Sequence, residues 1–78
     1  MEIELFTRPG CHLCEAARQV ILAERRGHPF HLTERNVEDR PDWEEAYGRD
    51  IPVVLIDGRK AFKHRVEPRA LRRYLERA

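Results

Sequence analysis

The sequence contains little cysteine and no long apolar stretch. Its 78 residues include two cysteines, and one closely spaced pair closes too short a loop to serve as a stabilising disulfide framework. No stretch approaches the length of a membrane span, and the first residues lack a basic segment followed by an apolar run. We therefore expect a soluble cytoplasmic protein with no membrane partner, whose thiols stay reduced unless they cycle.

An excess of charge of one sign is also missing. The chain has 15 lysines and arginines against 14 aspartates and glutamates, a formal net charge of +1. The arginines near the C-terminus are the strongest argument for nucleic-acid binding, but Glu67 and Glu76 lie among them, as is typical of a solvated helix face. We expect no nucleic-acid partner, and the length predicts a single domain spanning residues 1–78.

What the sequence does contain is a pair of cysteines two residues apart. Cys11 and Cys14 are predicted to lie where an apolar strand turns into a helix. The free N–H groups and positive dipole end of that helix stabilise a thiolate, and Cys14 would lie one turn further along the same face. A thiolate at Cys11 can attack a disulfide, and Cys14 can then resolve the mixed disulfide. The same two thiols could instead supply half of a zinc site.

Hydrophobic periodicity and turn residues predict the order strand, helix, strand, helix, strand, strand, helix. The apolar run 53–56 is typical of a central strand buried on both faces, and Asp57-Gly58 is a strong hairpin signal. The expected elements are strand 2–7, helix 11–26, strand 30–36, a short helix within 39–48, strand 53–56, strand 59–63 and a helix that begins near 67–68.

The first helix is predicted because apolar residues recur with helical spacing, namely Leu13, Ala16, Ala17, Val20, Ile21 and Ala23. The second and third helices are each predicted to pack through one apolar face, formed by Trp43, Ala46 and Tyr47 in the second and by Ala70, Leu71, Tyr74 and Leu75 in the third.

The order of elements, the segment from Phe6 to Cys14 and the Ile51-Pro52 pair resemble a glutaredoxin, the minimal member of the thioredoxin fold. The similarity covers essentially the whole chain. It implies an α/β fold of the order β-α-β-α-β-β-α, with a four-stranded mixed sheet flanked by helices on both faces. The first strand–helix–strand unit is expected to be right-handed, with its strands parallel.

The resemblance also implies roles for individual residues. Cys11 matches the nucleophile of the family, and Cys14 matches the resolving thiol. Pro52 matches a cis-proline that lies against the active-site disulfide, which would leave the backbone groups of Ile51 open for strand-like pairing with a peptide or with glutathione. Arg8 matches a basic position that in many glutaredoxins helps bind the glycine carboxylate of glutathione, and its charge would favour the Cys11 thiolate.

The chain departs from the family pattern at three places. His12-Leu13 stands between the cysteines where many glutaredoxins have Pro-Tyr, and the segment 62–66 replaces the usual Gly-Gly and acidic residue that bind the γ-glutamyl end of glutathione. Leu5 lies near the place where thioredoxin has a buried acidic residue. Protonated His12 would raise the positive potential beside Cys11 or tune the redox potential of the pair; the alternative is an exposed residue without a role.

These observations predict a thiol–disulfide oxidoreductase of glutaredoxin type that reduces protein disulfides or glutathione mixed disulfides. We expect a monomer with no bound cofactor and no bound metal, reduced by glutathione or by a flavoprotein reductase. One alternative is a zinc-binding or iron–sulfur-carrying module that uses the same cysteines. Another is a redox-responsive binding protein, because the same groove serves both binding and turnover.

Overall fold

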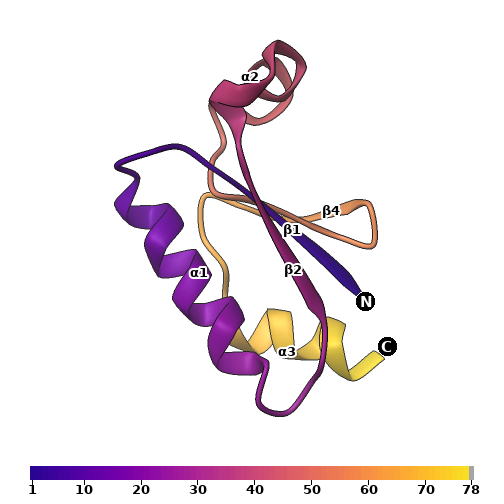
Figure 1. Cartoon of the computed structure of the whole chain (residues 1–78). Helices are drawn as coiled ribbons and strands as arrows, with labels where there is room; N and C mark the ends of the chain where they lie inside the picture. The colour runs from indigo at the N-terminus through magenta and orange to yellow at the C-terminus, as the bar shows by residue number, and fades with distance from the viewer. Residues whose placement is uncertain (78) are drawn as a thin grey trace.

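The computed structural model describes residues 1–77, whose arrangement is shown in Figure 1. The predicted order of elements is confirmed, with a short 3₁₀ helix added before α2. The elements are β1 (Glu2–Thr7), α1 (His12–Glu24), β2 (His31–Asn36), η1 (Val37–Asp39), α2 (Pro41–Tyr47), β3 (Val53–Ile56), β4 (Arg59–Lys63) and α3 (Pro68–Arg77). Across these residues, none of the helices combines the length and the apolar character that crossing a membrane requires.

The strands form a four-stranded mixed sheet in the order β2-β1-β3-β4. β1 and β2 are parallel, with Glu2 opposite His31 and Thr7 opposite Asn36. β3 runs antiparallel to both β1 and β4. The predicted sheet is therefore confirmed, and its order places the two most apolar strands in the centre, where both of their edges are paired.

Side chains of the two central strands alternate between two apolar clusters. The larger cluster lies under α1 and α3 and consists of Ile3, Leu5, Ala17, Ile21, Val54, Ile56, Val66, Leu71 and Leu75. The smaller cluster consists of Phe6, Val37, Val53 and Leu55, with Trp43, Tyr47 and Ile51 packed against it. Because successive strand residues face opposite sides, this division confirms that β3 is buried on both faces and that helices cover both. Figure 1 shows α1 and α3 next to each other, away from α2.

Helix α1 is shorter than the predicted range 11–26. It begins at His12 because Cys11 has extended backbone angles (φ −91°, ψ 107°) and serves as the N-cap. It ends at Glu24, after which the chain turns, with the Gly27 N–H donating to the Glu24 carbonyl at 3.3 Å. The second strand begins at His31, one residue later than expected.

Helix α2 lies within the predicted range 39–48. Arg40 is its N-cap, Pro41 lies in its first turn, and Gly48 is its C-cap. The preceding 3₁₀ turn, Val37–Asp39, was not predicted. This turn buries Val37 in the smaller cluster, so it closes the end of the sheet beside α2.

Two residues predicted to pack in the core are exposed instead, Ala46 in α2 and Tyr74 in α3. The face of α1 that meets the sheet consists of Cys14, Ala17 and Ile21, a stripe with helical spacing. The other apolar residues of α1 include Leu13, Ala16 and Ala23, which are exposed. The apolar residues of α1 span a wider arc than the sheet covers, so part of that arc remains at the surface.

The β3–β4 hairpin turns at the two residues expected. Asp57 (φ 49°) and Gly58 (φ 83°) both have the positive φ that a tight hairpin turn demands. The carboxylate of Asp57 also accepts a hydrogen bond of 2.8 Å from the Glu2 N–H. The turn is thereby attached to the first residue of β1.

Candidate active site

The two cysteines lie together at the N-terminus of α1 and are joined by a disulfide, with their Cα atoms 5.2 Å apart. The Sγ atom of Cys11 accepts a hydrogen bond of 3.1 Å from the Cys14 N–H. Cys11 is half-buried, whereas Cys14 is only 1% exposed. The sulfur that caps the helix is therefore the accessible one, and it occupies the position where a free N–H group and the helix dipole favour negative charge.

A tight turn after β1 places Cys11 at the helix entrance. The Cys11 N–H donates to the Arg8 carbonyl at 3.3 Å, and Gly10 has φ +78°, which a residue with a side chain rarely adopts. Both cysteines border a polar hollow of about 190 Å³ between this turn and the end of β2. Glu15, Arg18 and Asn36 complete its wall, so this side of the disulfide presents charged groups.

Ile51 and Pro52 lie at the same end of the sheet as the cysteines. The peptide bond between them is cis, as the resemblance implied. Phe6 pairs with Val53 in the antiparallel register, so Pro52 falls opposite Thr7, at the point where β1 gives way to the cysteine loop. Pro52 is fully buried and Ile51 half-buried, and among the described residues no backbone hydrogen bond involves Ile51 outside the strands and helices. The pairing of Ile51 with a substrate stays a prediction.

The Arg8 guanidinium is held by groups of the protein itself. It donates to the Glu38 carboxylate at 3.2 Å, to the Glu44 carboxylate at 2.6 Å and to the Gly48 carbonyl at 3.3 Å. The hydrogen bonds to Glu44 and Glu38 raise the pKa of Arg8 above its usual value. The guanidinium is therefore bound by groups of η1 and α2, while Arg8 also lines the hollow beside the two cysteines. The role toward a substrate carboxylate that the resemblance implies stays a prediction.

The sequence contained no signal for these partners of Arg8, because they lie 30 to 40 positions away in the chain. Gly48 was predicted only as the end of a helix. The structure adds a second reason for glycine there: a Cβ would lie 2.6 Å from both the backbone oxygen and a carboxylate oxygen of Glu44. Gly48 therefore leaves room for the carboxylate that binds Arg8.

Two histidines lie near the disulfide. His12 is exposed in the first turn of α1, next to Cys11, and its tuning role stays a prediction. His64 has a positive φ of 71°, and its N–H donates to the carbonyls of Pro52 (2.8 Å) and Asp50 (3.0 Å). The segment after β4 is thereby attached to the cis-proline segment.

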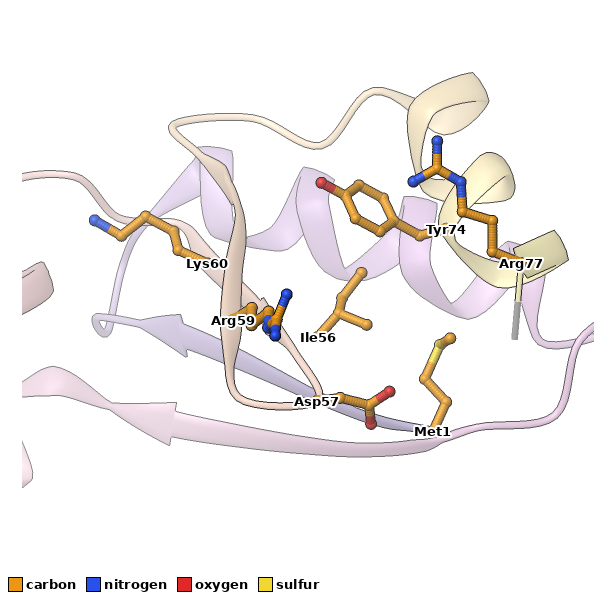
Figure 2. A pocket seen from close by; sticks show the side chains of 7 residues that line it. All are labelled: Met1, Ile56, Asp57, Arg59, Lys60, Tyr74 and Arg77. Atoms are coloured by element: carbon orange, nitrogen blue, oxygen red, sulfur yellow. The ribbon is translucent and has the colours of Figure 1, made fainter.

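Within residues 1–77, no group of three or more His, Cys, Asp and Glu side chains has an arrangement suited to a metal ion. A larger hollow of about 480 Å³ lies at the opposite end of the sheet, at the β3–β4 turn (Figure 2). Ile56 lies at its centre, with Met1, Arg59 and Tyr74 around it. It is remote from the sulfurs and shares no residue with the hollow beside them.

Comparison with known proteins agrees with the geometry of the site. A family model of the glutaredoxin-like domain (DUF836) matches residues 2–76. A Dictyostelium discoideum protein named as glutaredoxin-like is 34% identical over 73 residues, which are 86% of this chain and 68% of that protein. The X-ray structure of protein XcR50 from X. campestris superposes with a TM-score of 0.76 at 31% identity and covers 97% of each chain.

A more distant likeness shows the fold alone. Thioredoxin 1 from Thermosipho africanus has a TM-score of 0.63 at 20% identity, with 97% of this chain and 96% of that chain covered. The protein is thus a thioredoxin-fold chain with a Cys-x-x-Cys disulfide at the start of its first helix. It belongs to the glutaredoxin-like domain family.

Proposed function

We propose that this protein is a thiol–disulfide oxidoreductase that reduces protein disulfides or glutathione mixed disulfides. The observation that carries the proposal is the asymmetry of the cysteine pair: Cys11 caps the helix and is accessible, whereas Cys14 is buried one turn further along. An attacking thiol must be reached by the substrate, and a resolving thiol needs only to reach the first sulfur. The arrangement suits Cys11 to the first role and Cys14 to the second.

The reaction proceeds in two exchange steps. The Cys11 thiolate attacks one sulfur of the substrate disulfide, forms a mixed disulfide and expels the other substrate sulfur as a thiolate, which takes up a proton. Cys14 then loses its proton and attacks the Cys11 sulfur, which forms the Cys11–Cys14 disulfide and releases the second substrate thiol. Two electrons pass to the substrate, and glutathione or a flavoprotein reductase returns two electrons to the protein.

The residues around the cysteines fit an extended substrate. The backbone of Ile51, beside the buried Pro52, can pair with a peptide or with glutathione as a strand edge does. A substrate carboxylate would compete with Glu38 and Glu44 for Arg8. Protonated His12 adds positive charge beside Cys11. The cycle requires the reducing conditions of the cytoplasm, where we place the protein.

The test compares two cysteine variants with the wild-type protein on glutathione disulfide and on a reducible protein disulfide. Cys11→Ser is expected to abolish turnover of both substrates. Cys14→Ser is expected to form a mixed disulfide at Cys11, which intact-mass spectrometry detects. If the reduced wild-type protein were no faster than Cys11→Ser on either disulfide, the proposal would be wrong.

A further inference from the structure

An apolar groove of about 360 Å³ runs beside the cysteine pair, on the side away from Arg8. One wall is α1, with exposed Leu13 and Ala16 and half-buried Val20, and the other is the chain between β4 and α3, including His64, Arg65 and Val66. Leu13 stands between the two cysteines and is 58% exposed. The α1 wall therefore begins with an exposed side chain next to the disulfide and ends at Val20, which packs against the larger cluster.

The opposite wall of the groove is attached to the substrate-binding edge. The His64 N–H donates to the Pro52 carbonyl at 2.8 Å, so this wall starts at the cis-proline and leads away from it. Because His64 both lines the groove and hydrogen-bonds to Pro52, the groove is one residue away from the Ile51 backbone through that contact. The groove and the disulfide therefore lie within the reach of one extended segment.

The permanent charge in the groove lining is that of Arg65, and exposed Lys63 lies two residues before it. The lining includes no acidic residue, but the Asp50 carboxylate lies 3.5 Å from the Nε2 atom of His64, so Arg65 is the group that can meet the charge of a ligand. Arg65 is 80% exposed, and its ion pair of 3.3 Å with Glu67 joins two exposed side chains. Such a pair contributes little to stability and is easily exchanged for another carboxylate. The complementary ligand therefore carries a negative charge next to an apolar side chain.

The length of the groove sets the size of the segment it accepts. Leu13 and Val20 are seven helical positions apart, a distance of about 10 Å at 1.5 Å per residue. An extended chain covers that distance in about three residues. Glutathione lacks a large apolar side chain. Of the two features that the resemblance assigns to glutathione binding, Arg8 is bound by Glu38 and Glu44, and the Gly-Gly pair after β4 is absent from the sequence.

We propose that the groove binds a short extended segment of a protein substrate, with an apolar side chain against Leu13 and Val20 and a carboxylate against Arg65, both within about three residues of the substrate cysteine. This inference rests on the proposed function and names its substrate class. The groove gives affinity for the apolar side chain, because contiguous exposed apolar surface beside a reactive group is a typical interaction site. Arg65 gives discrimination by charge.

The test reverses the charge of one side chain in the protein and of one side chain in the peptide substrate. The substrates are symmetric disulfides of short peptides that contain Cys-Leu-Glu, Cys-Leu-Lys or Cys-Ser-Glu, with glutathione disulfide as reference. Rapid-quench chromatography at low ionic strength gives the rate at which each oxidises the reduced protein. Wild type is expected to react about tenfold faster with the Leu-Glu peptide than with the Leu-Lys peptide. Arg65→Glu is expected to reverse that order.

Two controls isolate the groove from other effects. Arg59→Glu makes the same change of charge in the remote hollow of Figure 2 and is expected to keep the wild-type order. Leu13→Ser is expected to slow the Leu-Glu peptide about fivefold, to the rate of the Ser-Glu peptide. The rate of Leu13→Ser with glutathione disulfide is measured alongside and reports thiol reactivity, so the expected result is a fall in the ratio of the Leu-Glu peptide rate to the glutathione disulfide rate.

The outcomes separate this inference from the proposed function. Equal rates for the three peptides, or an order of rates that Arg65→Glu leaves unchanged, would overturn the proposal that the groove binds the substrate. Cys11-dependent reduction would continue in that case. If neither the peptides nor glutathione disulfide oxidised the protein through Cys11, both proposals would fall.

Discussion

The two faces of the sheet are held by different interactions. Under α1 and α3 the core is aliphatic, with Ile21 and Leu71 fully buried. Under α2, Phe6 meets the rings of Trp43 and Tyr47 at centroid distances of 5.6 and 4.3 Å. Salt screens exposed ion pairs such as those of Arg8, whereas it does not screen apolar contacts. Helix α1, which carries both cysteines, is therefore held mainly by buried aliphatic side chains, and α2 by half-buried rings and by the ion pairs of Arg8.

The largest effect is expected from the aliphatic face. Leu71→Ala removes a side chain with 0% exposure between α3 and the sheet, and the lost burial and the cavity together are expected to lower the free energy of unfolding by about 3 kcal/mol. Urea denaturation measures the change. Leu22→Ala is the matched control, because Leu22 is 36% exposed on α1. Similar losses for the two variants would contradict the assignment of the larger cluster as the main core.

A smaller effect is expected from the aromatic face. Trp43 is half-buried, packs edge-on against Phe6, and lies under the guanidinium groups of Arg35 and Arg40 at 5.4 and 5.1 Å. Trp43→Ala is expected to cost about 2 kcal/mol, less than a fully buried ring. Amide hydrogen exchange is expected to accelerate in α2 far more than in α1. Equal acceleration in both helices would show that the faces are not independent.

A third prediction concerns Arg8, whose guanidinium is bound by groups of η1 and α2. Arg8→Gln is expected to change the rate with glutathione disulfide less than twofold, because the guanidinium is already bound by Glu38 and Glu44. The melting temperature is expected to fall by a few degrees at low salt, with the difference disappearing near 1 M salt because exposed ion pairs are screened. A large rise in KM for glutathione disulfide would instead return Arg8 to the role that the family resemblance implies.

The smallest effect is expected from an ion pair between α1 and α3. Arg72 donates two hydrogen bonds to Glu24, at 3.0 and 2.9 Å, and they lower the pKa of Glu24 below its usual value. A lowered pKa adds stability that is present above the unfolded-state pKa of about 4.3 and is lost as pH falls through the folded-state value.

The variant Glu24→Gln tests this linkage. At pH 7 it is expected to melt a few degrees below wild type, and the difference in melting temperature is expected to shrink as the pH falls through the lowered folded-state pKa of Glu24. Thermal unfolding followed by circular dichroism at pH 7 and in acid measures the difference. A difference in melting temperature that stayed the same in acid would mean that the Glu24 side chain acts through packing and not through its charge.

Much of the fold could be predicted because its signals are local. The strand 53–56 is a run of apolar residues between a proline and a hairpin dipeptide, and the structure has it with the predicted bounds. The buried face of α1 could not be predicted in the same way, because Leu13 and Ala17 are both apolar and both fit the helical repeat. Only the position of the sheet selects Cys14, Ala17 and Ile21 for burial, and other apolar residues of α1 line the groove.

For the site, the sequence by itself determined that two cysteines stand at the start of a helix, that a turn at Gly10 precedes them and that Ile51-Pro52 follows a short second helix. These features depend on residues close together in the chain. The tertiary structure alone decided that Cys14 is buried and Cys11 accessible, and that Arg8 binds Glu38 and Glu44. It also decided that the groove beside the disulfide is apolar and lined by Arg65, because burial and ion pairing depend on which distant segments the sheet brings into contact.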